Sequence, residues 1–355
     1  MQTNYIAFDT ETHLIAPGRQ APPVVVAQIF APHEGPEALV YSHHEKQIEP
    51  LAASILSGER GLITGHNIAF DMAVLCANYP ALIPLVFEAY AKRRIVCTLE
   101  REKLLVIAEG DLLTGRDFSL EGLTRRYTPT HLKNAQDPWR LRFGELDRLP
   151  VSEMPVEALY YAKNDVIAQH AVTLAQDTRK QLVWQDEPVL EDQFAQAASA
   201  FALQLISAWG IHTDPYQVAQ FEAQEIARLE SHREGLVQAG LVRADGTKNT
   251  KAAKAYATTV FEALGSPQPL TEKGEISLSA EACETSLDPT LIAYAEFGTT
   301  KTLLARIERL KKGGEFPIQS RFNNLVASGR TSCSEGDGKK GVRGLAGRGV
   351  ALLRG

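Results

Sequence analysis

The order of short apolar runs in the first hundred residues constrains the fold of this chain more than any other feature. Three runs rich in β-branched or aromatic side chains, separated by turns that contain Pro or Gly, lie at residues 4–8, 24–30 and 38–42. They predict three successive strands. Helical spacing follows at residues 46–56 and 70–77, with a short apolar run at residues 61–64 between them. Strands first, then helix and strand in alternation, predict an α/β sandwich around a mixed sheet.

The remaining sequence predicts how the chain is divided into domains. Residues 110–150 are rich in Gly, Pro, Arg and Asp and predict ordered loops around one short helix at residues 120–126. Pro155 suits the first turn of a helix, and residues 156–181 then contain neither Pro nor Gly. Beyond residue 186, long segments rich in Ala, Leu, Gln and Glu predict a mainly helical domain. We therefore expect domains at residues 1–185 and 186–335, followed by a flexible, basic, Gly-rich tail at residues 336–355.

Charge is distributed unevenly along the chain. The formal net charge is −6 over 355 residues, but residues 1–184 carry 18 Lys and Arg against 22 Asp and Glu, residues 185–300 carry 7 against 17, and residues 301–355 carry 12 against 4. The last segment either attracts a polyanion or forms a solvated basic face. No apolar run approaches the roughly 18 residues that span a bilayer, and no signal peptide opens the sequence. We expect a cytoplasmic protein with no membrane segment.

Two carboxylates stand at the end of the first predicted strand, in the sequence Phe-Asp-Thr-Glu-Thr. Asp9 and Glu11 are two residues apart, so on a strand their side chains share one face. Adjacent carboxylates repel each other and raise each other's pKa unless a cation lies between them. Mg²⁺ and Mn²⁺ prefer carboxylate oxygens. The pair indicates a divalent cation site, with a solvated acidic face as the alternative.

Two further aspartates lie at positions where an acidic side chain is unfavourable without a partner. Asp71 follows a Gly-His-Asn turn among apolar neighbours, so it is either paired, bound to a metal or placed to stabilise a helix N-terminus. Asp165 lies inside the long helix, where propensity disfavours Asp, and Tyr161 precedes it by four residues on the same face. The phenol there can hydrogen-bond a water or phosphate near a metal-binding carboxylate. Taken alone, an exposed Asp and a core Tyr explain the second pattern as well.

Together these elements closely resemble the DEDD superfamily of 3′→5′ exonucleases over roughly the first 180 residues. The chain supplies Asp9, Glu11, Asp71 and Asp165 in the order of the family pattern, with Tyr161 four residues before the last Asp, and is similar to the tyrosine subclass. The resemblance implies a ribonuclease H-like fold and two divalent ions, Mg²⁺ or Mn²⁺, held by the four carboxylates. It also implies that Asp9 bridges the two ions and that Tyr161 and Glu11 orient the attacking water. The product would be a 5′-mononucleotide released from a 3′ end.

Three stretches of the second half resemble family A DNA polymerases. Residues 201–214 (FALQLISAWGIHTD) are similar to the helix and turn that open the polymerase region, and residues 264–277 (LGSPQPLTEKGEIS) resemble a thumb stretch. Residues 321–334 (RFNNLVASGRTSCS), the most specific match, are similar to the family's Gly-Arg-x-Ser-Ser segment. The resemblance implies a proofreading exonuclease acting in DNA replication and repair, followed by an incomplete, thumb-like helical domain.

The expected DNA contacts centre on the Gly-Arg-Thr-Ser sequence, whose hydroxyls, backbone N–H groups and guanidinium suit phosphate oxygens. Arg330 is the leading candidate, and such cationic contacts make binding depend on salt. The other expected contacts are Thr331, Ser332, Asn67 and Lys301. Additional candidates in the loop-rich stretch are Lys133, Trp139 and Arg142.

Two other functions fit parts of the sequence. Ribonuclease D-like RNA exonucleases share the carboxylate pattern, and a non-catalytic DNA-binding subunit of a split polymerase would share the second half. The palm and fingers of a polymerase do not follow Ser334 in this sequence, so we expect no nucleotide addition by this chain alone. The expected partner is DNA, as a single-stranded 3′ end or a primer-template. A separate polymerase chain or a processivity factor would be a further partner.

Overall fold

The computed structural model describes residues 3–58, 61–111, 113–128, 137–326 and 330–335. Its contacts divide the chain into two compact units, one of residues 1–210 and 319–355 and the other of residues 211–318. The predicted flexible tail at residues 336–355 and the candidate Lys133 lie outside the described residues. In the described part of the chain, no helix combines the length and apolar character needed to cross a membrane.

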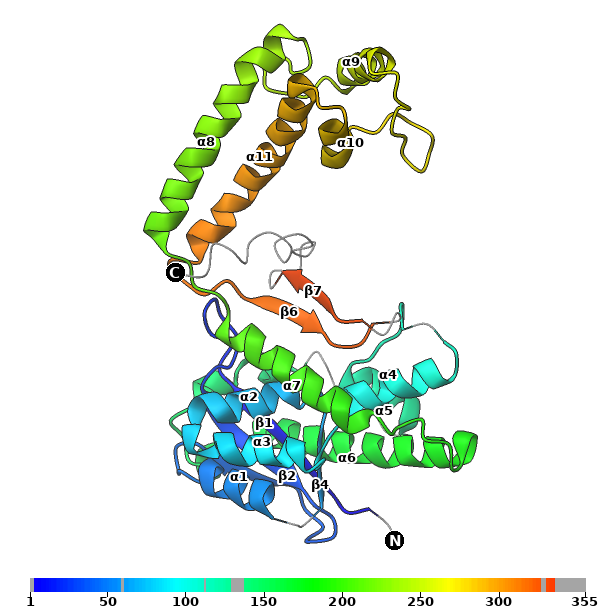
Figure 1. The fold of residues 1–355 in the computed structure, drawn as a ribbon. Coiled ribbons are helices and arrows are strands. Elements are labelled where there is room, and N and C mark those ends of the chain that lie inside the picture. Colours follow the sequence, from blue (N-terminus) through cyan, green and yellow to red (C-terminus); the bar gives the residue numbers. More distant parts are fainter. Residues whose placement is uncertain (1–2, 59–60, 112, 129–136, 327–329, 336–355) are drawn as a thin grey trace. The chain divides into compact units, whose positions relative to one another are not determined.

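A mixed sheet of five strands forms the centre of the first unit (Figure 1), with the strand order β3-β2-β1-β4-β5. The strands are β1 (Tyr5–Thr12), β2 (Val24–Phe30), β3 (Leu39–Ser42), β4 (Leu62–Gly65) and β5 (Ile95–Cys97). The first three pair antiparallel, whereas β4 pairs parallel with β1 and β5 pairs parallel with β4. The mixed sheet predicted from the sequence is therefore confirmed.

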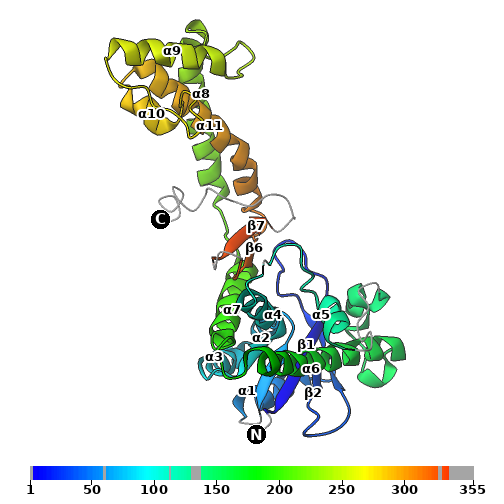
Figure 2. The ribbon, with the colours of Figure 1, turned by 90° about the vertical axis from the view of Figure 1, so that its right-hand side faces the viewer.

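The two faces of β1 have different chemistry. Ile6 and Phe8 are buried in the main apolar core on one face, against α1 (Ile48–Ser57) and α2 (Ala69–Asn78). The alternate side chains Ala7, Asp9 and Glu11 point to the other face, since successive side chains on a strand alternate. Ala7 packs with Val166 there. Figures 1 and 2 show α1, α2 and α3 (Ile83–Ala91) on one side of the sheet and α6 (Val156–Trp184) on the other.

Helix α6 carries a buried polar row toward the sheet. The row follows helical spacing and consists of Tyr161, Asp165, Gln169, Thr173 and Gln176. The Thr173 and Thr64 hydroxyls lie 2.8 Å apart and share a hydrogen bond. The Gln176 amide donates to the Thr98 carbonyl at 2.9 Å and to the Glu102 carboxylate at 3.1 Å. Hydrogen bonds, and not apolar packing alone, therefore fix the position of α6.

Buried charges on α4 (Thr98–Ala108) hold the C-terminal half of α6. Glu102 is fully buried and accepts hydrogen bonds from the Tyr127 hydroxyl at 2.7 Å and from Arg179 at 3.1 Å. Arg101, only 1% exposed, pairs with Asp177 of α6. Each of these buried charges has a partner of opposite sign, as burial requires. Tyr127 belongs to α5 (Leu120–Tyr127), close to the short helix predicted at residues 120–126.

Helix α7 (Gln193–Trp209) belongs to the first unit, whereas the sequence placed it in the second domain. The Phe201 ring stacks on Tyr90 with 4.5 Å between centroids, and Ala197 is buried in the same core. These two residues are four apart and form one apolar stripe on α7. Ala-rich composition predicted the helix but not the surface that it covers. The predicted boundary at residue 185 therefore differs from the division by contacts, which falls at Gly210.

A two-stranded hairpin of β6 (Ser320–Asn323) and β7 (Ser332–Glu335) also belongs to the first unit. The Lys103 ammonium donates to the Asn323 side chain at 3.0 Å, and the Asn324 amide donates to the Gln196 carbonyl at 3.1 Å. These bonds attach the first part of the stretch at residues 321–334 to α4 and α7. Remaining short elements of the unit are 3₁₀ turns at Pro80–Leu82, Pro138–Leu141, Phe143–Leu146 and Val151–Glu153.

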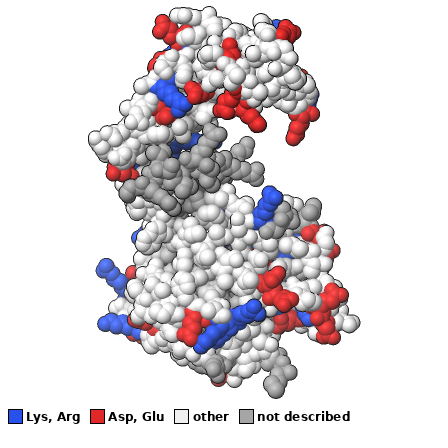
Figure 3. All heavy atoms as spheres, viewed as in Figure 1, with Lys and Arg blue, Asp and Glu red and all other residues white. Residues whose placement is uncertain are grey.

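The second unit is helical, as the sequence predicted. Its helices are α8 (Pro215–Gln238), α9 (Thr250–Ala263), α10 (Ala280–Thr285) and α11 (Pro289–Lys312). Its main core cluster includes Leu236, Tyr294 and Phe297. The two long helices start alike: Asp214 and Asp288 accept hydrogen bonds from the backbone of the first turn, and a Pro follows each of them. On the face drawn in Figure 3, acidic side chains gather over α9 and α10, in agreement with the acidic excess of residues 185–300.

Removal of one cap tests the second unit. Asp288→Ala leaves the Leu291 N–H, which now donates to Asp288 at 2.8 Å, without its side-chain acceptor. We expect the free energy of unfolding to fall by about 1 kcal/mol. Asp288→Asn retains an equally good cap and should stay close to the wild type. Urea unfolding followed by far-ultraviolet circular dichroism measures both variants; an equal loss in the two would show that charge, and not capping, is the cause.

Candidate active site

Three carboxylates that are distant in the sequence meet on the α6 side of the sheet. Asp9 and Glu11 come from β1, and Asp165 comes from α6. Each offers an oxygen, and these three oxygens all lie within 4.8 Å of one another. Glu11 is 9% exposed and Asp165 is 6% exposed, while Asp9 is half-buried. The structure thus brings together three of the four carboxylates that the sequence predicted as metal ligands.

Asp71, the fourth predicted ligand, is held against β1 by Thr10. The Thr10 backbone N–H and hydroxyl both donate to one Asp71 oxygen, at 3.0 and 2.6 Å. Asp71 lies in the first turn of α2 and is 3% exposed. Burial raises the pKa of Asp71 to about 7, the Thr10 hydrogen bonds act in the opposite direction, and the nearby charge of Asp165 adds to the rise. Asp71 therefore needs a compensating positive charge to stay ionised near neutral pH.

Tyr161 lies one turn before Asp165 on α6 and is 6% exposed. Its ring packs against Phe143, with 6.0 Å between centroids. Burial raises the pKa of Tyr161 far above the usual range, and the charges of Asp165, Glu11 and Asp9 raise it further. The phenol therefore keeps its proton near neutral pH and can donate a hydrogen bond beside the carboxylates.

The turn between β4 and α2 leaves no room for a side chain at its start. A Cβ added to Gly65 would lie 3.0 Å from both the Ile68 side chain and the Phe8 carbonyl oxygen. Asn67 follows with a φ of 56°, a left-handed conformation that Asn tolerates, and its side chain is exposed. The His66 ring nitrogen lies 2.9 Å from the Thr98 hydroxyl. This tight turn places the start of α2, and with it Asp71, against β1.

The other predicted DNA contacts lie in different parts of the structure. Arg330 and Thr331 are exposed just before β7, which begins with the exposed Ser332. Lys301 belongs to the second unit, where its ammonium donates to the Gly246 carbonyl at 2.9 Å. The Arg142 guanidinium stacks 4.7 Å from the centre of the Trp139 ring. Arg330, Thr331 and Ser332 are thus accessible to solvent. The DNA-binding roles of all these residues stay predictions.

Two glutamines that the sequence analysis missed contact the carboxylates. The Gln28 amide donates to Asp9 at 2.7 Å and to Glu11 at 3.3 Å, and the Gln169 amide donates to the other Asp9 oxygen at 2.9 Å. Gln169 follows Asp165 by four residues, so helical spacing alone could have pointed to it. Gln28 lies opposite Asp9 in the register of β1 and β2, which the sequence does not reveal.

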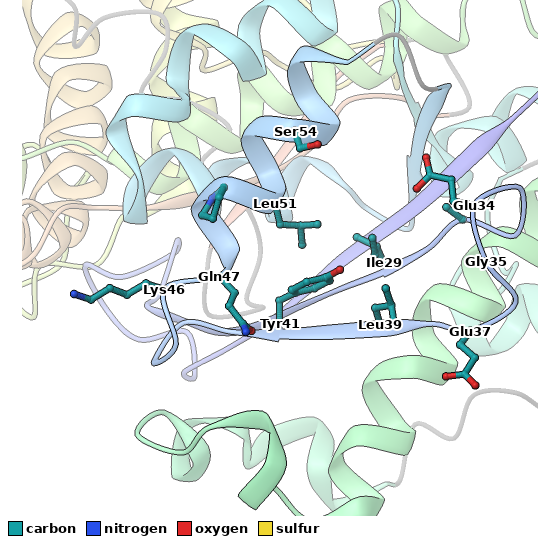
Figure 4. Close-up of a pocket in the computed structure, with 12 residues that line it drawn as sticks. Ile29, Glu34, Gly35, Glu37, Leu39, Tyr41, Lys46, Gln47, Leu51 and Ser54 are labelled. Atoms are coloured by element: carbon teal, nitrogen blue, oxygen red, sulfur yellow. The ribbon is translucent and has the colours of Figure 1, made fainter.

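A groove in the same unit lies away from this site (Figure 4). Its walls include Ile29, Leu39 and Tyr41 of the sheet and Leu51 of α1, with Glu34 and Glu37 at one end and Lys46 at the other. Ile29 follows Gln28 on β2, so the two side chains point to opposite faces of the sheet. The groove is therefore on the α1 face and takes no part in the carboxylate site.

The donor set fits a hard divalent cation. It consists of carboxylate oxygens, which Mg²⁺ and Mn²⁺ prefer, and three of the carboxylates lie close enough to share an ion. The buried amide oxygens of Gln28 and Gln169 also have no hydrogen-bond partner among the described residues. The Gln176 amide oxygen, away from the cluster, shares this property, so the carboxylate donor set and not these amide oxygens indicates the metal. The carboxylate cluster thus meets the chemical requirements for metal binding.

Comparisons with known proteins agree with this site. A mixed sheet that carries carboxylates and a buried phenol beneath a long helix is the arrangement expected of a hydrolytic nuclease. The family model for the 3′-5′ exonuclease of family A DNA polymerases matches residues 1–182, and the chain belongs to this family. The exonucleases of this family depend on metal ions. A search of curated proteins found no match.

Two solved structures are similar to the chain. One is the POL domain of Pol1 from M. smegmatis in complex with DNA primer-template and dNTP, with 15% identity and a TM-score of 0.50, covering 94% of this chain and 51% of that chain. The chain thus spans about half the length of that polymerase chain and shares its fold. The other is Brucella melitensis NrnC bound to pGG, with 19% identity and a TM-score of 0.40, covering 58% of this chain and 86% of that chain. The ribonuclease H-like fold predicted from the sequence, followed by a helical region, is confirmed.

The raised pKa of Asp71 predicts how pH affects the metal-free protein. The folded protein keeps a proton on Asp71 up to about pH 7, whereas the unfolded chain releases it near the usual value of 3.8. The folded state binds more protons between these values, so raising the pH from 5 to 8 lowers the free energy of unfolding, by roughly 2–3 kcal/mol from this group. Asp71→Asn cannot ionise and should lose less stability over the same interval.

Urea unfolding with a chelator present, at pH 5 and pH 8, measures this difference. The control is Asp186→Asn, which changes an exposed aspartate outside the site. It should show the pH dependence of the wild type. If Asp71→Asn shows that dependence as well, Asp71 is not protonated in the folded, metal-free protein.

Proposed function

We propose that this chain is a metal-dependent 3′-5′ exonuclease that removes 5′-mononucleotides from DNA 3′ ends and proofreads in DNA replication and repair. The observation that carries the proposal is the group formed by Asp9, Glu11 and Asp165, whose oxygens lie within 4.8 Å of one another. Membership of the exonuclease family of family A polymerases supports the reaction class. DNA as substrate is supported by the fold shared with a polymerase solved on a DNA primer-template.

The carboxylates are proposed to hold two divalent cations, Mg²⁺ or Mn²⁺. Asp9, Glu11, Asp71 and Asp165 would hold these ions. When bound, such cations stabilise the charge that develops on the attacking and leaving oxygens of a phosphodiester. Asp71 stands outside the group whose oxygens lie within 4.8 Å of one another, and Thr10 holds one of its oxygens beside β1. The buried carboxylates repel one another without a cation, which favours binding of the metal.

Tyr161 and Glu11 are proposed to orient the attacking water. The high pKa of Tyr161 keeps its hydroxyl protonated, so it can donate a hydrogen bond to an oxygen at the site. Its ring is fixed by Phe143, so the hydroxyl direction is set before substrate binds. Fixed groups of this kind raise the rate by positioning the reactants.

The remaining proposed contacts are to the DNA backbone. Arg330, Thr331, Ser332, Asn67 and Lys301 offer charge, hydroxyls and an amide, and phosphate contacts of this type position DNA without reading its bases. Residues 211–318 are proposed to correspond to the thumb of a family A polymerase. A separate polymerase chain or a processivity factor is a proposed further partner. From the resemblance to family A polymerases, the proposed place of action is the cytoplasm of a bacterial or phage-infected cell.

Digestion of 5′-labelled single-stranded DNA tests the proposal. With Mg²⁺ or Mn²⁺ we expect a ladder that shortens from the 3′ end, and chelator should abolish it. Asp9→Ala should abolish it as well, since a proposed metal ligand is lost. Asp186→Asn, the exposed-aspartate control, should digest DNA like the wild type.

The same assay separates the alternatives. A ladder on RNA in preference to DNA would replace the proposal with an RNA exonuclease. Retained DNA binding without any ladder would mean that the chain is a binding module. Equal activity of Asp9→Ala and the wild type would show that the carboxylate cluster is not the active site.

The role of Tyr161 has its own test. Tyr161→Phe removes only the hydroxyl and keeps the ring that packs on Phe143. We expect kcat to fall by about 10²-fold, as for other losses of positioning, while DNA binding and thermal stability stay close to the wild type. Single-turnover digestion measures the rate. An unchanged rate would exclude Tyr161 from the reaction.

A further inference from the structure

Two buried amides flank one carboxylate of the candidate site. Gln28 donates to one Asp9 oxygen at 2.7 Å, and Gln169 donates to the other at 2.9 Å. Gln28 comes from β2, the strand paired with β1, and Gln169 comes from α6, which covers this face of the sheet. Both side chains are almost fully buried, Gln28 at 0% and Gln169 at 1% exposure. Both oxygens of Asp9 are thus fixed from two different elements.

Gln28 also spans the two carboxylates of β1. Its amide nitrogen lies 2.7 Å from an Asp9 oxygen and 3.3 Å from a Glu11 oxygen. Two N–H donors directed at two neighbouring anions offset their repulsion and set the distance between them. The direct pairing of Asp9 with Gln28 across β1 and β2 makes this contact part of the strand register.

The carbonyl oxygen of each of these two amides lacks a hydrogen-bond donor among the described residues. Both of these oxygens, on Gln28 and Gln169, are buried. A buried acceptor without a donor lowers the stability of the folded protein. If packing were the only role of such a glutamine, replacing it with an apolar residue would not lower the free energy of unfolding. The two amides thus direct their N–H groups at Asp9, and that contact is the part of each side chain that bears on the carboxylates.

We propose that Gln28 and Gln169 are positioning residues of the metal site. They hold Asp9, and through Gln28 also Glu11, in the arrangement that a divalent cation requires before the cation arrives. This inference rests on the proposed function, because it assumes that the carboxylates bind a metal.

Shape-matched substitutions separate positioning from packing. Met has nearly the length and volume of Gln without its hydrogen bonds, so the variants are Gln28→Met and Gln169→Met. The matched control is Gln176→Met. Gln176 is a buried glutamine of the same helix row whose amide donates to Thr98 and Glu102 and to none of the proposed metal ligands. Calorimetric titration of each purified, metal-free protein with Mn²⁺ gives the affinity, and thermal unfolding with chelator gives the stability.

We expect Gln28→Met and Gln169→Met to bind Mn²⁺ about 10–100-fold more weakly than the wild type, as is typical for the loss of a group that orients a ligand. Gln176→Met loses hydrogen bonds that hold the far part of α6 and none to Asp9 or Glu11, so it should weaken Mn²⁺ binding much less than either site variant. Unchanged or tighter binding by both site variants would overturn the inference. A wild-type protein that binds no Mn²⁺ would instead overturn the proposed function, so the two failures are distinguishable.

A measurement on the unaltered protein covers the case in which a variant does not fold. The side-chain NH₂ signals of Gln28, Gln169 and Gln176 can be followed by nuclear magnetic resonance during titration with Mg²⁺. We expect the signals of Gln28 and Gln169 to shift in step with metal binding, while those of Gln176 stay in place. Metal binding that leaves the Gln28 and Gln169 signals unmoved would overturn the inference.

Discussion

Repulsion among buried carboxylates is the constraint on which the first unit depends. Strand β1 and helix α6 bring together the carboxylates of Asp9, Glu11 and Asp165. Asp71 is buried near enough for the charge of Asp165 to raise its pKa. Burial of like charges is unfavourable unless donors or cations surround them. The protein supplies part of the compensation itself, through Thr10 on Asp71 and through two amides on Asp9. The repulsion that remains uncompensated favours a cation. The same arrangement that is unfavourable in the metal-free protein would therefore be the source of the proposed affinity for metal.

The rest of the unit makes that arrangement possible. Alternation along β1 sends Ile6 and Phe8 into the apolar core and Asp9 and Glu11 to the opposite face, so one strand provides both stability and chemistry. Helix α6 approaches the polar face with a row of hydrogen-bonding side chains, and the fully buried Glu102 fixes the far part of that helix through Gln176 and Arg179. Small displacements of α6 would move Asp165 and Tyr161 together, since both lie on it.

Much of this could be predicted from the sequence, and the remainder could not for identifiable reasons. Local periodicity predicts strands β1 and β2, the long helix α6 and the helical second unit, because periodicity depends only on residues that are neighbours in the sequence. The four carboxylates and Tyr161 were recognisable because their order and spacing match a family pattern. Gln28 escaped notice because its role depends on cross-strand register, and the buried state of Glu102 depends on partners that are distant in the sequence. The assignment of α7 depended on which surface Ala197 and Phe201 cover, and composition does not contain that information.

The second unit is inserted within the first, and its two ends meet. Ile211 and Ile318 exchange backbone hydrogen bonds of 2.9 Å in both directions, so the chain leaves the first unit and returns to it at neighbouring positions. During synthesis, the hairpin of β6 and β7 is therefore made only after the whole insert. Until then, the surface of α7 and α4 that the hairpin covers stays exposed. The same closure means that the insert can be lengthened, shortened or exchanged in evolution without altering the sheet that carries the carboxylates.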